Sequence, residues 1–357
     1  PFFQPGMNFH RGFYQWEYVR GLQQDRWRSP LLATPERMKK YRHRENPDRS
    51  FLENDVTYRH VANNVWIEKE EDHPTARVYQ WAMEFVQQNA GLQPFYLYLD
   101  TFPPHEPWEA PASFYQKYAD PSYSGETIIH CYYGAAKNWY TEQEVRNIYA
   151  HYRGLCSLVD YWFGQFWKVL EQEKILDNTL VVFLSDHGTN FPWENEEGII
   201  GKPAYALFPA VMSLPLMVRF PDGAGAGRCF SSFVYNIDVT ATIYAAAGLA
   251  NKVNIEGQNL RKLIFSGNWQ EREYLTSRYG EYLWYRDRKH WVVLTSQGKG
   301  KYVFDVEADP NCQRNLAADR KEVVGKAYRC CLQDAGGEIP VYSEGTFTDA
   351  IGQKVKE

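Results

Sequence analysis

The tetrapeptide Ser185-Asp186-His187-Gly188 is one place in this 357-residue sequence where side chains that could do chemistry lie next to each other. It directly follows the apolar run 179–184, which is typical of a buried strand. Ligands of open α/β sheets bind at the carboxyl ends of strands, so the Asp186 carboxylate and the His187 imidazole could face one cation there. The structural alternative is a turn in which Asp186 only caps the next segment.

Two other short motifs carry side chains that could contact a substrate oxygen. Pro103-Pro104-His105-Glu106-Pro107-Trp108 follows a second apolar run, 95–99, and its prolines could hold the imidazole at hydrogen-bonding distance. Gly201-Lys202 lies between two expected strands and could present a point charge to an anionic oxygen. Taken separately, each has a simpler interpretation: a histidine satisfied by backbone groups in a proline-rich turn, and a surface lysine.

Helices and apolar strands alternate through the first three quarters of the chain, which indicates an α/β sandwich. The expected elements are a helix over 74–89, a strand over 95–99, a long helix opened by the capping box Thr141-x-x-Glu144, strands over 179–184 and 214–220, and a helix over 239–247. The run 179–184 is continuously apolar, as in a parallel sheet covered on both faces. Asp238 is the expected N-cap of the last helix and Gly248 its stop.

The pattern changes after residue 264. Four short aromatic and β-branched runs, 273–278, 282–286, 290–295 and 301–305, are separated by turn residues and predict a small antiparallel sheet. A helix over 319–333 would pack on this sheet. We therefore place a domain boundary near residue 268, with a first domain over 1–268 and a C-terminal subdomain over 269–357.

Composition excludes several classes of protein. The net charge is −5, from 39 Lys and Arg against 44 Asp and Glu, and there is no basic stripe of the kind that nucleic-acid binders usually show. The longest wholly apolar stretches are far shorter than the roughly 20 residues of a membrane-spanning helix. The six cysteines have neither zinc-ligand nor CxxC spacing, so the redox compartment and the localisation stay open.

Taken in order, these segments resemble the sulfatase family of the alkaline-phosphatase superfamily. The matching segments are 95–108, 159–188 with its DNTLVVFLSDHG block, Gly201-Lys202, 214–221 and 302–317. The resemblance implies an alkaline-phosphatase-like α/β/α sandwich, incomplete at its N-terminus, with a small C-terminal α+β subdomain. It also implies an enzyme, a metal-dependent hydrolase of sulfate esters. A phosphonate or phosphate-ester hydrolase on the same scaffold is the alternative, and a non-catalytic ligand-binding pseudoenzyme is a second.

The resemblance also assigns roles to single residues. Asp186 and His187 match two ligands of one divalent metal ion, for which calcium or manganese is expected. His105 matches a loop histidine that contacts the transferring group or protonates the leaving oxygen, and Lys202 a lysine that binds an anionic oxygen. Independently of the resemblance, Trp108 is a candidate substrate-binding residue that could line a pocket for a sugar or aryl group, with packing in the core or in a loop as the alternative. The expected partner is a small-molecule or glycan sulfate ester, or a phosphonate or phosphate ester, with no nucleic acid and no membrane span.

The family's nucleophile is a Cys or Ser in a C/S-x-P/A-x-R frame, converted to formylglycine, and no segment of this sequence matches that frame. The near match Ala33-Thr34-Pro35-Glu36-Arg37 has Ala at the nucleophile position. We therefore expect a chain that lacks an N-terminal portion with the formylglycine and two metal carboxylates, and that is inactive as it stands. A pseudoenzyme is the other explanation.

Overall fold

The computed structural model describes residues 8–22, 25–41, 56–250, 252, 254–265 and 269–340. The chain forms two compact units: unit 1 holds Pro1–Cys131 and Tyr140–Leu176, and unit 2 holds Tyr132–Trp139 and Asp177–Glu357. Each unit is described by itself. The predicted domain boundary at residue 268 falls on residues 266–268, outside the described part of the chain, and stays a prediction.

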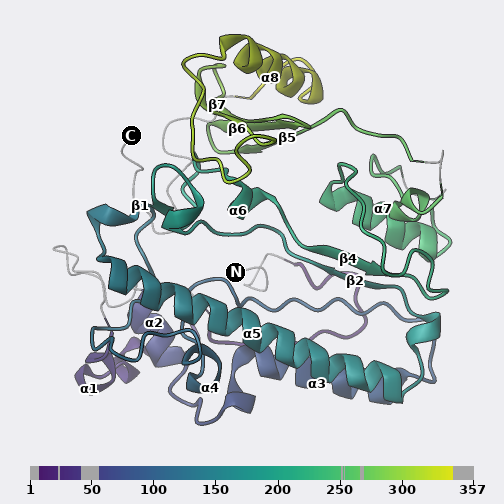
Figure 1. The fold of residues 1–357 in the computed structure, drawn as a ribbon. Coiled ribbons are helices and arrows are strands. Elements are labelled where there is room, and N and C mark those ends of the chain that lie inside the picture. Colours follow the sequence, from purple (N-terminus) through teal and green to yellow (C-terminus); the bar gives the residue numbers. More distant parts are fainter. Residues whose placement is uncertain are drawn as a thin grey trace. The chain divides into compact units, whose positions relative to one another are not determined.

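Unit 1 is built on the 31-residue helix α5 (Glu142–Gln172). The predicted capping box begins it, because the Glu144 N–H donates to the Thr141 hydroxyl at 3.3 Å and the Thr141 N–H donates to the Glu144 carboxylate at 2.8 Å. Helix α3 (Pro74–Asn89) has the predicted bounds and packs along α5 (Figure 1). The shorter elements of unit 1 are η1 (Pro30–Leu32), α1 (Pro35–Met38), α2 (Val56–Asn63), η2 (Glu70–Asp72) and α4 (Ala112–Tyr115).

The predicted strand over 95–99 is wrong. This segment belongs to no sheet among the described residues. Tyr96 and Tyr98 are 55% and 61% exposed, whereas the positions between them are half-buried. The burial of the segment alternates as in a strand, but a strand also needs a neighbouring backbone that pairs with it.

The C-terminal sheet of unit 2 is antiparallel, as predicted. Four antiparallel strands follow one another as β5 (Tyr274–Tyr279), β6 (Tyr282–Asp287), β7 (His290–Thr295) and β8 (Gly300–Asp305). Along β7, Trp291 and Val293 face one buried cluster, whereas Val292 and Leu294 face another. This alternation follows from the two-residue period of a strand and buries the sheet on both faces.

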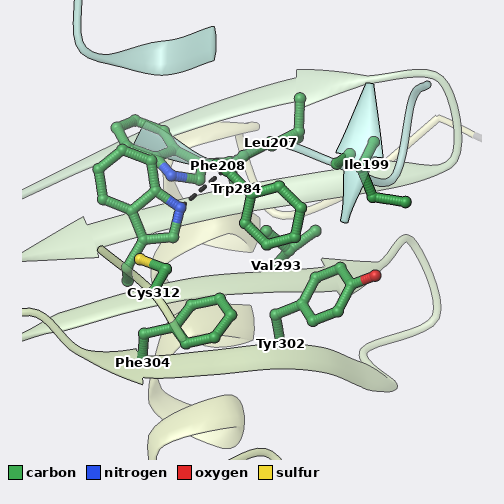
Figure 2. Close-up of a cluster of buried hydrophobic side chains, with 10 residues drawn as sticks. Ile199, Leu207, Phe208, Trp284, Val293, Tyr302, Phe304 and Cys312 are labelled. Carbon is green, nitrogen blue, oxygen red and sulfur yellow. Dashed lines mark hydrogen bonds between the residues drawn. The ribbon is translucent and has the colours of Figure 1, made fainter. Parts of the chain in front are cut away.

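Two different layers cover these faces. Helix α8 (Lys321–Asp334) lies over one face and supplies Val323, Val324 and Ala327 to the cluster there. On the other face, Ile199, Leu207 and Phe208 reach across to the sheet, and the Trp291 indole N–H donates to the Leu207 carbonyl at 2.7 Å. Figure 2 shows this second cluster, in which Phe208 lies near Tyr302 and Val293. The segment around 199–208 is thereby fixed to the C-terminal sheet.

Strand β2 (Val181–Leu184) pairs with β4 (Leu216–Arg219), and the two strands are antiparallel. The prediction of a fully buried, parallel strand over 179–184 is therefore wrong for this pair. The residues of β2 are half-buried or exposed, and Leu184 is 40% exposed. An apolar run indicates a strand, but its direction relative to its neighbour depends on a segment more than thirty residues away in the sequence. A second small ribbon joins β1 (Gly134–Ala135) to β3 (Ile199–Ile200).

Helix α7 (Asn236–Ala246) begins earlier than predicted. Asp238 is not its N-cap but its third residue: its carboxylate accepts from the Tyr235 N–H at 2.7 Å and pairs with Arg272 at 2.7 Å. Gly248 ends the helix as predicted, with a φ of +71° that favours glycine. The remaining short elements of unit 2 are η3 (Ala136–Asn138), η4 (Leu176–Asn178), η5 (Pro192–Glu194), α6 (Pro209–Met212) and η6 (Leu260–Leu263). Among the described residues, no helix combines the length and apolar character needed to cross a membrane.

Candidate functional site

The turn that follows β2 brings the side chains of Asp186 and His187 together. One Asp186 oxygen accepts from the His187 main-chain N–H at 2.7 Å, and the other lies 3.7 Å from His187 Nε2. Nδ1 of His187 lies 3.0 Å from the Gly188 carbonyl oxygen, which fixes the neutral ring as the tautomer with its proton on Nδ1. Nε2 then carries a lone pair. A carboxylate oxygen and an imidazole nitrogen are thus held close enough to bind one cation.

Gly188 is required at this turn by a close approach of the backbone. Its N–H donates to the Val211 carbonyl at 2.9 Å, and a Cβ added to it would lie 2.0 Å from the Ala210 carbonyl oxygen. Both residues belong to α6. No side chain fits at that distance. The glycine of the Asp-His-Gly motif therefore allows the backbone of α6 to contact the turn and hold it by a hydrogen bond.

A buried asparagine connects this turn to the Gly201-Lys202 segment. The Asn190 side chain is fully buried, and its amide donates to the carbonyls of Gly201 and Ala206, both at 3.0 Å. The main chains of Asn190 and Gly201 also exchange two hydrogen bonds, of 3.0 and 3.2 Å. The structure therefore places Asp186, His187 and Lys202 on two segments of one unit that are bonded to each other.

Lys202 is half-buried beside an aromatic ring. Gly201 has a φ of +81°, and a Cβ there would lie 2.1 Å from the Tyr133 ring. The Lys202 ammonium lies 5.9 Å from the centre of the same ring, at the outer limit of a cation–π contact. The Tyr133 ring therefore packs on Gly201 and lies beside the side chain of Lys202, the next residue.

The Asp186–His187 pair fits a divalent cation in the kind of donor it offers. Calcium prefers oxygen ligands, whereas imidazole together with carboxylate also suits manganese, zinc or iron. Across the described ranges, no group of three or more His, Cys, Asp or Glu side chains is arranged to hold a metal ion. The pair thus offers two donor atoms, and its role as a metal site stays a prediction.

His105 belongs to unit 1, where its loop holds it from several sides. Its Nδ1 lies 2.7 Å from the Glu106 carbonyl oxygen and 3.4 Å from the Glu106 carboxylate, and its ring packs on Phe102 with centres 4.4 Å apart. The Thr101 hydroxyl donates to the Pro103 carbonyl at 2.9 Å. The side chain is 22% exposed, so the imidazole is oriented by the loop and still reaches the surface.

Trp108 is a support of this loop in the structure. It is fully buried, its indole N–H donates to the Pro104 carbonyl at 2.9 Å, and its ring packs edge-on against Tyr152. Its main-chain N–H donates to the Ile129 carbonyl at 2.6 Å. This burial does not support the expected contact of Trp108 with a substrate.

Sequence reasoning missed three polar residues around these motifs: Asn190, Glu106 and Glu109. Glu109 directly follows the loop, is ion-paired with His60 at 3.0 Å and Lys40 at 2.8 Å, and accepts from the Tyr41 hydroxyl. Burial tends to raise its pKa, but the hydrogen bonds and charges of His60 and Lys40 outweigh it and lower the pKa below its usual range. The one available signal was the acidic residue at each end of Glu106-Pro107-Trp108-Glu109.

Comparison with known proteins now joins these motifs to a family. A family model described as Sulfatase matches residues 3–249, and one described as N-sulphoglucosamine sulphohydrolase, C-terminal, matches residues 205–326. An arylsulfatase of Clostridium perfringens is 23% identical over 310 residues, covering 78% of this chain and 61% of that protein. An endo-4-O-sulfatase of Bacteroides thetaiotaomicron is 26% identical over 298 residues, covering 72% of this chain and 55% of that protein.

A solved structure shows the same fold. The phosphonate monoester hydrolase of Agrobacterium radiobacter has a TM-score of 0.59 at 20% identity, covering 75% of this chain and 62% of that one. The likeness confirms the predicted alkaline-phosphatase-like fold class. The chain spans less than two thirds of the length of each of these three proteins. Because the Sulfatase model matches well over half of its residues, with the Asp-His-Gly turn and the Gly-Lys segment inside the match, the chain belongs to the sulfatase family.

Proposed function

We propose that the complete protein hydrolyses sulfate esters. The observation that carries this proposal is the hydrogen-bonded connection in unit 2 between the Asp186–His187 turn and Lys202 through Asn190. It links the segment with a carboxylate and an imidazole, both of which can bind a metal ion, to the segment with the Lys202 ammonium. This combination suits an ester whose non-bridging oxygens carry negative charge. The activity is assigned to the complete protein because the relatives are longer than this chain and no segment here has the C/S-x-P/A-x-R frame.

Asp186 and His187 would hold a divalent cation, calcium or manganese. When bound, such an ion supplies positive charge to a substrate oxygen and to the group that attacks it. Asp186 contributes a carboxylate oxygen, and the Nδ1–H tautomer of His187 contributes Nε2. The formylglycine nucleophile expected for this family is proposed for the complete protein and is assigned to no residue of this chain.

His105 and Lys202 would act on the ester itself. Lys202 binds a non-bridging oxygen and stabilises charge that builds there in the transition state. His105 donates a proton to the leaving oxygen as its bond to sulfur breaks, which matters most for poor leaving groups. The substrate class is a sulfate ester of a small molecule or of a glycan.

Steady-state kinetics of the complete, metal-loaded protein test this function. We expect turnover of an aryl sulfate ester to exceed turnover of the matching aryl phosphonate ester, and to disappear after treatment with a chelator and return with calcium or manganese. A preference for the phosphonate ester would support the alternative activity that the fold also permits. If the metal-loaded protein cleaves neither ester, both proposals are wrong and a non-catalytic binding role takes their place.

A further inference from the structure

We propose that Glu106 is a positioning residue for His105, which it orients through both its main-chain carbonyl and its buried carboxylate. This inference deepens the proposed function and rests on it for the role of His105. The imidazole of the Pro-rich loop would be ready for proton transfer because the neighbouring acidic residue fixes which ring nitrogen holds the permanent proton.

The hydrogen-bond geometry decides the tautomer. Nδ1 of His105 lies 2.7 Å from the Glu106 carbonyl oxygen, and a carbonyl only accepts, so Nδ1 carries a proton in the neutral and in the charged ring. The proton that comes and goes is therefore the one on Nε2. When His105 acts as an acid, this Nε2 proton goes to the leaving oxygen as the ester bond breaks. The ring that remains is neutral, and its Nδ1–H still donates to the Glu106 carbonyl.

The carboxylate of Glu106 adds a charge to this geometry. The side chain is 1% exposed, and one of its oxygens lies 3.4 Å from His105 Nδ1. A buried carboxylate is costly unless it is paired, and a neighbouring negative charge stabilises an imidazolium. Glu106 thus favours the protonated ring that an acid catalyst needs, while the imidazolium lowers the cost of burying Glu106.

Neighbouring residues hold the His105 ring next to Glu106. Phe102 packs against the His105 ring at 4.4 Å, and the His105 main-chain N–H donates to the Phe102 carbonyl at 3.0 Å. The Trp108 indole N–H donates to the carbonyl of Pro104, the residue before His105. The ring therefore has packing on its face and a hydrogen-bond partner on Nδ1, and Glu106 supplies that partner.

The variant Glu106→Gln tests the carboxylate, because it keeps the carbonyl and the side-chain volume and removes the charge. In the complete protein, we expect kcat to fall about tenfold for esters with poor leaving groups and little for those with good ones. In a double-mutant cycle, Glu106→Gln should cause no further loss once His105 is replaced by Ala, because it acts through that ring. Additive losses would overturn the proposal.

Glu109→Gln is the matched control. It removes a second carboxylate next to the same loop, and it breaks the contacts with His60, Lys40 and Tyr41 instead of one with His105. Loss of stability alone would affect both variants, whereas only Glu106→Gln should change the dependence of kcat on the leaving group. If kcat depended on the leaving group in the same way in both variants, Glu106 would have only a structural role.

A measurement independent of turnover separates this proposal from the proposed function. The midpoint pH of the His105 ring can be followed by NMR in the 357-residue chain with labelled histidine. We expect the midpoint to move about one pH unit lower in Glu106→Gln and to stay in Glu109→Gln, because only the first removes a negative charge beside Nδ1. An unchanged midpoint in Glu106→Gln would contradict the proposal even in an active enzyme. If the wild type cleaves no ester but the midpoint moves, the proposed function is wrong and the orienting contact is confirmed.

Discussion

The two candidate metal ligands are adjacent in the sequence, which makes their joint placement a property of a single bend in the backbone. Successive residues of a strand point to opposite faces, so Asp186 and His187 could not converge if β2 continued. The chain bends at Asp186, and the contact of Gly188 with α6 fixes that bend. The 3.7 Å between Oδ2 and Nε2 is the result.

Replacing Asp186 by Asn should lower both metal content and turnover of the complete protein. An amide oxygen is a weaker, neutral ligand, so we expect less than one tenth of the wild-type turnover at a limiting metal concentration. Metal content is measured by elemental analysis after dialysis. Asp177→Asn is the control, because Asp177 lies near the other end of β2, is 98% exposed and pairs with Arg219 at 3.4 Å. Equal metal content in the two variants would refute the ligand role of Asp186.

The local sequence predicted the motif residues of this site but not the residues that hold them in place. Asp186, His187 and Lys202 could be recognised because a short motif follows an expected strand or lies between two. The Asn190 amide donates to carbonyls eleven and sixteen residues further along the chain, and no local sequence pattern predicts hydrogen bonds over that separation. The burial of Trp108 likewise depends on Tyr152 and Ile129, which the fold brings to it.

Helix α5 shows how a single glycine admits a neighbouring segment. Gly154 lies on the face that packs against the segment containing Ala110 and α4. A Cβ there would lie 2.7 Å from the Tyr115 Cβ and 2.8 Å from the Ala110 Cβ, and neither atom is the end of a flexible side chain. The same helix has a second glycine, Gly164, where an added Cβ meets nothing within 4 Å.

Gly154→Ala and Gly164→Ala should therefore have opposite effects on stability. In a helix interior, alanine is favoured over glycine by roughly 1 kcal/mol, so Gly164→Ala should raise the free energy of unfolding by up to that amount. At Gly154 the overpacking, about 1–3 kcal/mol, should exceed this gain and lower it. Urea unfolding of the two variants against the wild type measures both. Stabilisation by Gly154→Ala would show that the contact between α4 and α5 is looser than described.

The elements themselves were predictable wherever one periodicity extended over many residues. Helices α3 and α5 have the expected spacing of apolar residues, and strands β5 to β8 have the expected alternation with turns between them. Two errors occurred in short apolar runs, and a third concerned the start of α7. Residues 95–99 and β2 have strand-like composition, but their pairing depends on distant segments, and composition alone does not specify it.

Each unit of the molecule contains a partly or fully buried carboxylate that is paired with basic side chains. In unit 1 it is Glu109, and in unit 2 it is Asp287, which accepts from the Tyr285 hydroxyl and the Lys326 ammonium, both at 2.9 Å. Burial tends to raise the pKa of Asp287, but Lys326 and backbone N–H groups outweigh this and lower the pKa. Both carboxylates thus stabilise the fold above their ordinary pKa, and this stabilisation is lost as the pH falls below it.

Buried histidines near Glu109 add a loss of stability on acidification, which begins at a higher pH than the loss from the carboxylates. Burial lowers the pKa of His73 and of His151 from 6.5 to about 4 in each case, with the charge of His60 adding to the effect on His73 and Glu109 opposing it on both. Both rings are neutral in the fold and take up a proton in the unfolded chain near pH 6.5. The free energy of unfolding should therefore fall as the pH decreases from about 6.5 to 4, by about 1.4 kcal/mol per pH unit for each histidine.

His73→Asn isolates one of these two contributions. His73 Nδ1 accepts from the Thr75 N–H at 3.3 Å as the N-cap of α3, and an asparagine oxygen can replace that acceptor without a titrating group. Unfolding by urea at a series of pH values between 4 and 7 should give a slope of stability against pH that is smaller by about one proton than in the wild type. The stability of the wild type should fall relative to that of the variant as the pH decreases, because only the wild type loses stability by protonating His73 on unfolding. Parallel curves would mean that His73 takes up its proton equally in both states, and the acid sensitivity of unit 1 would then come from His151 and Glu109.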